Sequence, residues 1–220
     1  MRRSASWGLL AVAISLAACG CAEETEKPSS SEPTQRELLL GKWLLPGGGV
    51  GDRRYSFEDG GTFTLEVDSV GGTDTSTSTG TFTLDDSHRL TLAYEQQGVA
   101  LRPVETIYVS QTQLVIGGVL VAQDEPETIV GTWYSWRVNE TGGAVSSATR
   151  TIEFGDGGFG SLSTVVERTT NGVAEEPQTS TGSVRWSGEG PYQLTGDLSG
   201  TYTRDGDLLV DLGGAFQRSE

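Results

Sequence analysis

The sequence predicts an all-β protein in which two tandem antiparallel β-meander units, each a small barrel, follow an N-terminal segment outside the fold. Three observations support this prediction. Glycine contributes 31 of the 220 residues, and glycine with aspartate favours the tight turns that join short strands. Apolar and polar residues alternate with a period of two along much of the chain, as in half-buried strands. Short motifs also recur in one order in both halves, which indicates a duplicated unit.

Residues 1–18 have the layout of a secretory signal peptide. Arg2 and Arg3 give a positive start, and Trp7 to Ala18 form an apolar run of 12 residues. A membrane-spanning helix needs about 20 residues, so this run is too short to cross a bilayer. Its length and its basic start are typical of a signal peptide that is removed from the mature chain.

The apolar run ends in Leu-Ala-Ala-Cys at Leu16–Cys19, which resembles the lipobox of bacterial lipoproteins. The resemblance implies that cleavage precedes Cys19 and that acyl chains on Cys19 attach the protein to a membrane. Two or more such chains give stable anchoring. Gly20 stands where an aspartate would imply retention at the inner membrane. The resemblance therefore implies the outer membrane and leaves the periplasmic or surface face open.

Cys21 is the only other cysteine in the chain. If Cys19 carries lipid, Cys21 has no partner for a disulfide within the chain, and no framework of bridges exists. Two cysteines and one histidine also make a zinc site improbable on count alone. We interpret Cys21 as a residue of the tether without a specific role. The alternative is that it is oxidised to form an intermolecular disulfide.

Residues 19–37 are expected to form a flexible, lipidated tether. The segment is rich in serine, proline and glutamate and has no apolar periodicity, which is typical of disordered spacers. At its end, Thr34 and Glu37 have the spacing of a capping box ahead of three leucines. This spacing predicts a short helical turn at that point.

Internal repetition divides the rest of the chain into residues 38–123 and 124–220. Any one of the shared motifs is short, but their common order favours a duplicated unit. The motifs are Gly-x-Trp (Gly41 and Trp43; Gly131 and Trp133), Phe-x-Asp-Gly-Gly (Phe57–Gly61; Phe154–Gly158), Ser-Thr-Gly (Ser78–Gly80; Ser180–Gly182), and Tyr with Leu six residues later before Gly-Gly (Tyr108 and Leu114; Tyr202 and Leu208).

Alternation within each unit predicts the strands. Phe57 precedes an Asp-Gly-Gly turn and Phe63 follows it, each in an alternating run, which predicts a hairpin with one apolar face. The polar stretch from Thr73 to Thr83 keeps the alternation and is interpreted as an exposed strand. We expect six or seven strands per unit and no helix longer than a turn. Closure into a barrel would remove the exposed edges of such a meander.

The order of these motifs resembles the lipocalin-like domains of bacterial envelope proteins. In lipocalins the Gly-x-Trp tryptophan packs across the closed end of the barrel, and an arginine of the last strand often covers it. The resemblance therefore implies barrel-end roles for Trp43 and Trp133, and it assigns Arg218 to the second unit. The first unit has no matching arginine. Three arrangements are compatible with the sequence: barrels with a ligand cavity, two small barrels filled by side chains, and one larger barrel shared by both units.

Composition and residue counts argue against several functions. The formal net charge of −15 disfavours nucleic acid and anionic lipid as partners. His88, the only histidine, falls in a predicted turn, so no catalytic triad is expected. No pair among the many carboxylates stands out for glycoside hydrolysis. Asp156 and Asp205 sit in hairpin-turn sequences without calcium-loop spacing. We expect no catalytic residue, no cofactor and no metal.

Two further tryptophans are candidate ligand or interface residues. Trp136 lies three positions after Trp133, which places it on the opposite face of the strand. Trp186 alternates with Val184 near the end of another predicted strand. The leading hypothesis is a non-enzymatic, membrane-anchored binding module for a small apolar or amphipathic ligand or an envelope component. The alternative is a structural or protein-interaction module with filled barrels, and an enzyme ranks third.

Overall fold

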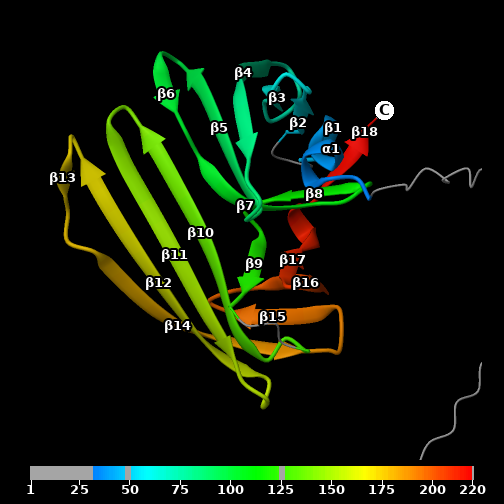
Figure 1. The fold of residues 1–220 in the computed structure, drawn as a ribbon, viewed down its shortest axis with the longest axis vertical. Helices are drawn as coiled ribbons and strands as arrows, with labels where there is room; N and C mark the ends of the chain where they lie inside the picture. Colours follow the sequence, from blue (N-terminus) through cyan, green and yellow to red (C-terminus); the bar gives the residue numbers. More distant parts are fainter. Residues whose placement is uncertain (1–31, 48–50, 124–126, 220) are drawn as a thin grey trace, which may run out of the picture. The chain divides into compact units, whose positions relative to one another are not determined.

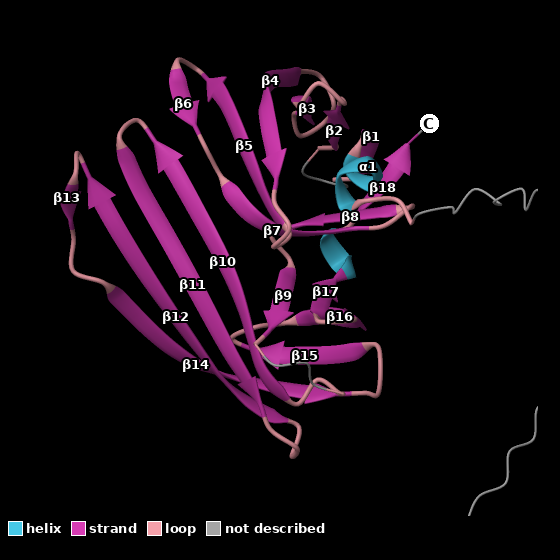
Figure 2. Ribbon diagram, in the orientation of Figure 1, coloured by secondary structure: helices cyan, strands magenta, loops and turns pink. Residues whose placement is uncertain are grey.

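The computed structural model describes residues 32–47, 51–123 and 127–219. Most of these residues are in β-strands, and the strand pairings are antiparallel (Figures 1 and 2). The predicted signal peptide, Cys19, Cys21 and most of the predicted tether lie outside the described residues. Residues from Pro33 onward form one compact unit.

The first helix begins where the sequence predicts. Helix α1 (Gln35–Leu39) has Thr34 as its N-cap, and Thr34 and Glu37 form the reciprocal bonds of a capping box. The capping-box prediction is therefore confirmed. The helix takes in the last three residues of the range assigned to the tether, and it places Leu39 in the core of the first set of strands.

Strand pairing closes a first ring of eight strands, termed ring 1. Each strand pairs with the next, and the last returns to the first. The strands of ring 1, in order around it, are β1 (Gly41–Leu45), β2 (Arg53–Phe57), β3 (Thr62–Asp68), β4 (Thr75–Leu84), β5 (Arg89–Gln96), β7 (Val104–Val109), β8 (Gln113–Ile116) and β18 (Phe216–Ser219).

A second ring of eight strands, termed ring 2, closes in the same way. Its strands, in order, are β9 (Val119–Ala122), β10 (Gly131–Thr141), β11 (Ala144–Phe154), β12 (Phe159–Thr170), β14 (Gln178–Ser187), β15 (Tyr192–Gly196), β16 (Gly200–Asp205) and β17 (Leu208–Asp211). Strands β6 (Val99–Leu101) and β13 (Val173–Ala174) extend hairpins, and a 3-10 turn, η2 (Leu212–Gly214), precedes β18.

The two rings exchange their last strands. Strand β18, at the C-terminal end, pairs with β1 and β8 of ring 1, whereas β9, from the first half of the chain, pairs with β10 and β17 of ring 2. In Figure 1 the red β18 accordingly lies beside the blue β1. Neither ring is therefore built from one side of the predicted boundary at residues 123/124 alone.

Each ring is filled by its own buried side chains. The core of ring 1 includes Trp43, Phe57 and Phe63, with Leu39 of helix α1 packed among them. The core of ring 2 is centred on Trp133 and Phe154. Burying a side chain of this size contributes roughly 1.5–3 kcal/mol, so each core stabilises its ring substantially.

A third cluster joins the outer faces of the rings. It contains Val115 of β8, Val119 of β9 and Val210 of β17. Their strand neighbours Leu114 and Leu209 point instead into the cores of ring 1 and ring 2. This alternation explains why both faces of these strands are apolar: one face fills a ring and the other packs against the neighbouring ring.

Several predicted local features are present. Strands β2 and β3 form the predicted hairpin, with Phe57 directly opposite Phe63, and the Thr73–Thr83 stretch lies mostly in β4 with most side chains exposed. The Tyr motif is less regular than its spacing indicates. Tyr202 is buried in the core of ring 2, whereas Tyr108 is half-buried beside the third cluster.

Candidate binding site between the two rings

One wall of ring 2 changes from apolar to polar along its length. Trp133, Ile152 and Leu162 face each other across β10, β11 and β12 and are buried in the core. Side chains two positions further along these strands share the same face. The next row therefore consists of Ser135, Arg150 and Thr164, which are paired in register. These three polar side chains line a pocket instead of filling the core.

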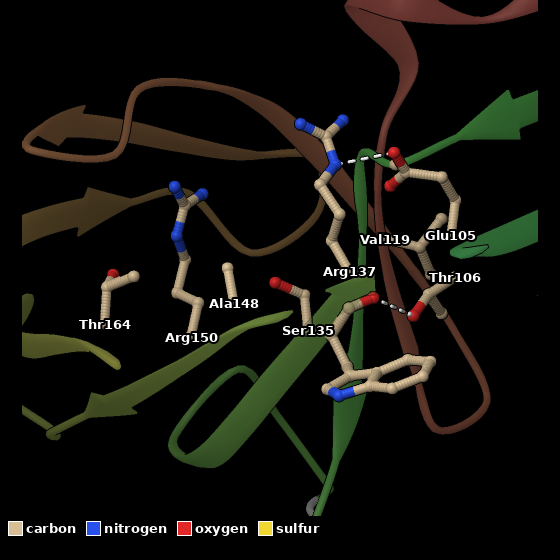
Figure 3. Close-up of a pocket in the computed structure, with 10 residues that line it drawn as sticks. Glu105, Thr106, Val119, Ser135, Arg137, Ala148, Arg150 and Thr164 are labelled. Atoms are coloured by element: carbon tan, nitrogen blue, oxygen red, sulfur yellow. Dashed lines mark hydrogen bonds and ion pairs between the residues drawn. The ribbon is translucent and has the colours of Figure 1, made fainter. Parts of the chain in front are cut away.

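The opposite wall of the pocket comes from β7, β9 and the turn between β8 and β9. It includes Glu105, Thr106, Gly117 and Val119. The cleft has a volume of about 180 Å³ and is shown in Figure 3. Since strand β7 belongs to ring 1 and strands β10 and β11 to ring 2, both rings contribute to this cleft.

An ion pair crosses the cleft from ring 1 to ring 2. Glu105 and Arg137 are directly opposite each other in the pairing of β7 with β10, and Arg137 Nε lies 2.5 Å from Glu105 Oε1. Gly117 leaves room for the pair, because a Cβ at this position would lie 3.0 Å from Glu105 Oε2. Its φ of +80° also favours glycine.

Burial raises the pKa of the Glu105 carboxyl above its ordinary value, while the charge and hydrogen bond of Arg137 act in the opposite direction. The short contact alone would favour a lowered pKa. However, the Arg137 side chain is 56% exposed, whereas that of Glu105 is only 13% exposed. Solvent around Arg137 weakens its attraction for Glu105, while the Glu105 carboxylate itself stays largely removed from water. The raised pKa therefore reflects burial as the larger effect.

Arg150 occupies the centre of the cleft without a counter-ion. Within the three described ranges it makes no ion pair and no hydrogen bond through its side chain. Figure 3 shows it between Ser135 and Thr164 on the neighbouring strands. On the core side, Arg150 lies close enough to the hydroxyl of Tyr202 to act on its pKa. Burial, together with the charge of Asp211, raises the pKa of Tyr202 to about 12, and Arg150 acts against this rise.

Trp136, predicted as a ligand or interface residue, lies on β10 and is among the residues that line the cleft. The Arg89 guanidinium of ring 1 lies over its indole, 4.6 Å from the ring centroid. The Thr106 hydroxyl donates a hydrogen bond to the Trp136 carbonyl oxygen at 3.4 Å. Trp136 therefore contacts ring 1 within the same chain.

Trp43 and Trp133 occupy matching places in the two rings. The Trp43 indole donates to the carbonyl oxygen of Leu39 at 2.8 Å, and the Trp133 indole donates to the carbonyl oxygen of Ile129 at 2.7 Å. Both side chains are fully buried. Each acceptor lies four residues before its donor, although Leu39 ends helix α1 and Ile129 lies in a bend.

Arg218 covers the tryptophan of ring 1, and its assignment to the second unit is wrong. Its guanidinium carbon lies 5.0 Å from the centroid of the Trp43 ring, and the two residues are paired in register. Arg218 also donates to the carbonyl oxygens of Leu40 and Gln111. Ala122 takes the corresponding place opposite Trp133. The physical reason is the strand exchange, since the arginine travels with β18.

Trp186, the second candidate contact residue, lies at one end of ring 2. It is half-buried, packs edge-on against Tyr192 at a centroid distance of 6.1 Å, and donates through its indole to the Gly155 carbonyl oxygen at 3.1 Å. The structure therefore does not bring Trp186 and Trp136 together in one site. His88, the only histidine of the sequence, lies in a turn with a φ of +60°. Its ring is beside the side-chain amide of Gln35.

The cleft residues Glu105, Arg137 and Arg150 were not singled out by the sequence. One signal was available in β10, where the core-facing positions run from Trp133 through Ser135 to Arg137. Such a change from apolar to polar on the inward face marks the place where a filled core gives way to a solvated cavity. The pairing of β7 with β10, which brings Glu105 to the site, had no local signal.

The described ranges contain no cluster of three or more histidine, cysteine, aspartate or glutamate side chains arranged to hold a metal ion. Within the same ranges, no helix is both long enough and apolar enough to cross a membrane. Comparison of the chain with protein-family models, with curated proteins and with solved structures gives no match.

Proposed function

We propose that this chain is a non-catalytic binding module of the bacterial envelope, attached to the outer membrane through an acylated Cys19, and that its ligand occupies the cleft between the rings. One observation carries the binding proposal. Both rings line the cleft, and its centre holds Arg150 without a counter-ion in the described residues. A pocket with a few convergent polar or charged groups is the default location of a ligand site.

The packing inside the rings favours the cleft, and not the interior of either ring, as the ligand site. The inside of each ring is occupied by large buried side chains such as Trp43 and Phe57 in ring 1 and Trp133 and Phe154 in ring 2. A ligand inside either ring would have to displace this core. The cleft already exposes polar groups at the polar end of ring 2 and requires no such displacement.

We also propose that the folded unit arose by duplication of a lipocalin-like unit whose last strands were exchanged. The matched indole hydrogen bonds of Trp43 and Trp133 support the duplication. Gly61 and Gly158 add support, with φ of +79° and +78°. Their carbonyl oxygens accept hydrogen bonds from the amides of Phe82 and Trp186, both at 2.8 Å.

The anchor is tested by metabolic labelling with a fatty acid in the native host. The Cys19→Ser variant is expected to lose acyl labelling and to accumulate as the uncleaved precursor. The matched Cys21→Ser variant is expected to keep both labelling and cleavage. The reverse pattern would move the anchor to Cys21 and contradict the lipobox assignment.

The binding proposal is tested by native mass spectrometry of the full chain extracted from its own envelope. A bound small molecule is expected on the unmodified protein and on Ala174→Leu, which changes an exposed residue of β13, a strand that contributes no residue to the cleft lining. Ala148→Leu fills part of the cleft, because Ala148 lines it opposite Arg137, and is expected to lose the adduct. An adduct retained equally by both variants would contradict the proposal.

A structural or protein-interaction module is the second candidate, favoured by the filled rings. Under this alternative, the cleft residues would serve only to join the rings. The extracted protein would then carry another protein of the envelope and no small molecule, and Ala148→Leu would leave this association unchanged.

A further inference from the structure

Three polar side chains form a continuous row across the floor of the cleft. Arg150 lies in register between Ser135 on one side and Thr164 on the other. Side chains in directly opposite positions of antiparallel strands have Cβ atoms about 4.5–5.5 Å apart, so Ser135 and Thr164 each flank Arg150 and lie about twice that distance from each other. None of these side chains has a hydrogen-bond partner within the described ranges. Each therefore keeps a donor available.

The charge of the site is opposite to that of the chain. Arg137 lies two residues after Ser135 on the same face of β10, opposite Ala148 and therefore diagonal to Arg150 on β11. Glu105 compensates Arg137, so Arg150 leaves one positive charge on the cleft of a protein with a net charge of −15. A positive charge in this cleft attracts anions locally, while the acidic remainder of the surface repels them.

The residue types select an oxyanion. A guanidinium presents a planar fork of N–H donors that matches the two oxygens of a carboxylate or of a phosphoryl or sulfuryl group. Hydroxyl donors on both sides can bond the remaining oxygen lone pairs. The volume of about 180 Å³ is smaller than the roughly 300–1,000 Å³ of typical ligand pockets. It suits one oxyanion group with a short remainder.

We infer that the cleft is an oxyanion-binding site in which Arg150 binds the anion, Ser135 and Thr164 donate flanking hydrogen bonds, and Arg137 supplies a second cation. Ala148 and Val119 form the apolar part of the lining and contact the group that carries the oxyanion. This inference rests on the proposed function for the location of the ligand and adds its chemical class.

The test is isothermal titration of the full chain, purified in a non-ionic detergent, with sodium acetate, sulfate and phosphate at constant ionic strength. At least one anion is expected to bind with one-to-one stoichiometry. Acetate alone would identify a carboxylate site, whereas sulfate and phosphate without acetate would identify a tetrahedral-anion site. Absence of saturable binding by all three would overturn the inference.

Matched variants locate the binding. Arg150→Gln is expected to weaken it by roughly tenfold or more, the loss of a hydrogen bond between charged groups. Thr164→Val, which keeps charge and shape, is expected to weaken it roughly two- to tenfold. Arg53→Gln removes the same charge from an exposed position on β2 and is expected to change affinity less than twofold. Equal losses in Arg150→Gln and Arg53→Gln would overturn the inference.

The result separates the inference from the proposed function. If the native adduct disappears in Ala148→Leu but no oxyanion binds, the cleft binds a ligand of another class and only the inference fails. If neither an adduct nor an anion is found, both fail.

Discussion

At the scale of single residues, the two buried tryptophans show how one side chain satisfies packing and hydrogen bonding together. Trp43 and Trp133 fill the rings and donate to carbonyl oxygens four residues earlier in the chain. A buried carbonyl without a donor loses its hydration without compensation. The indole nitrogen therefore fixes the approach of the preceding segment, while the ring supplies the apolar volume.

Trp133→Phe is expected to lower the free energy of unfolding by about 2–4 kcal/mol, because it removes the donor to Ile129 and leaves a cavity. Trp186→Phe is the control. Its indole also donates to a carbonyl oxygen, but at a partly exposed position, where water can replace the donor and the loss is about 1 kcal/mol. Urea unfolding measures both values, and equal losses would contradict the buried role of Trp133.

Glu105 gives the cleft a dependence on pH. Burial raises its pKa above 4.5, so lowering the pH from about 7 protonates Glu105 before ordinary surface glutamates. Protonation frees Arg137 from its counter-ion, and the positive charge on the cleft increases. Among the described residues, the charged or titratable groups that share the cleft with Glu105 or act on it are Arg137, Arg150 and the hydroxyl of the buried Tyr55, and none of them changes its charge in this range.

If sulfate is among the anions that bind, its binding is expected to strengthen as the pH falls from about 7 to the ordinary glutamate pKa of 4.5, which lies below the raised pKa of Glu105, because sulfate stays ionised over this range. Because the folded-state pKa is raised, Glu105 also stabilises the fold more below this pKa and less as the pH rises through it. Glu105→Gln is expected to bind sulfate tightly at both pH values when titrated by calorimetry. A pH dependence that persists in Glu105→Gln would assign the effect to other groups.

At the scale of elements, close approach between strands determines which glycines are needed. Gly80 of β4 lies between Phe63 and Tyr94 in the pairing of β3, β4 and β5. A Cβ on Gly80 would lie 2.1 Å from the Ala93 carbonyl oxygen and 2.8 Å from Tyr94 Cβ. These backbone atoms cannot move without disturbing the pairing. Gly60, in the neighbouring turn, has no heavy atom within 4 Å of that position.

Gly80→Ala is expected to lower the free energy of unfolding by about 1–3 kcal/mol through overpacking. The matched Gly60→Ala variant is expected to be neutral or slightly stabilising, because it restricts only the unfolded chain. Thermal unfolding of both variants gives the comparison. Similar destabilisation of the two would show that the turn, and not the strand contact, requires glycine.

Local pattern predicts the elements but not their partners. The capping box at Thr34 and the Phe57–Phe63 hairpin are contacts between residues close in sequence, and both were predictable. The place of Arg218 was not, because its contact with Trp43 spans most of the chain. The Glu105–Arg137 pair was missed for the same reason, since alternation gives the face of a residue but not the strand that will lie opposite.

At the scale of the whole folded unit, the exchanged strands make the two rings depend on each other. Ring 1 is closed by β18, which is synthesised last, and ring 2 is closed by β9 from the first half of the chain. Either half alone would leave unpaired strand edges, which promote association with other chains. The third apolar cluster, built from the outer faces of both rings, adds to this dependence. The cleft residues thus come together only when both rings are closed.

The exchange predicts crossed effects of core mutations. Phe216 lies near the C-terminus but packs in the core of ring 1, whereas Leu120 lies in the first half and packs in the core of ring 2. Each change to alanine is expected to cost about 2–5 kcal/mol. Native-state hydrogen exchange shows which strands lose stability in each variant, because amide exchange reports on the local opening of individual segments.

Phe216→Ala is expected to accelerate exchange mainly in β1 and β2, close to the N-terminal end of the folded unit, and to leave β11 and β12 better protected. Leu120→Ala is expected to do the opposite. If β18 instead closed the ring formed by the second half of the chain, Phe216→Ala would deprotect β10 and β17 and leave β1 unchanged. The pair of variants therefore distinguishes exchanged from unexchanged strands without removing any segment, and each serves as the control for the other.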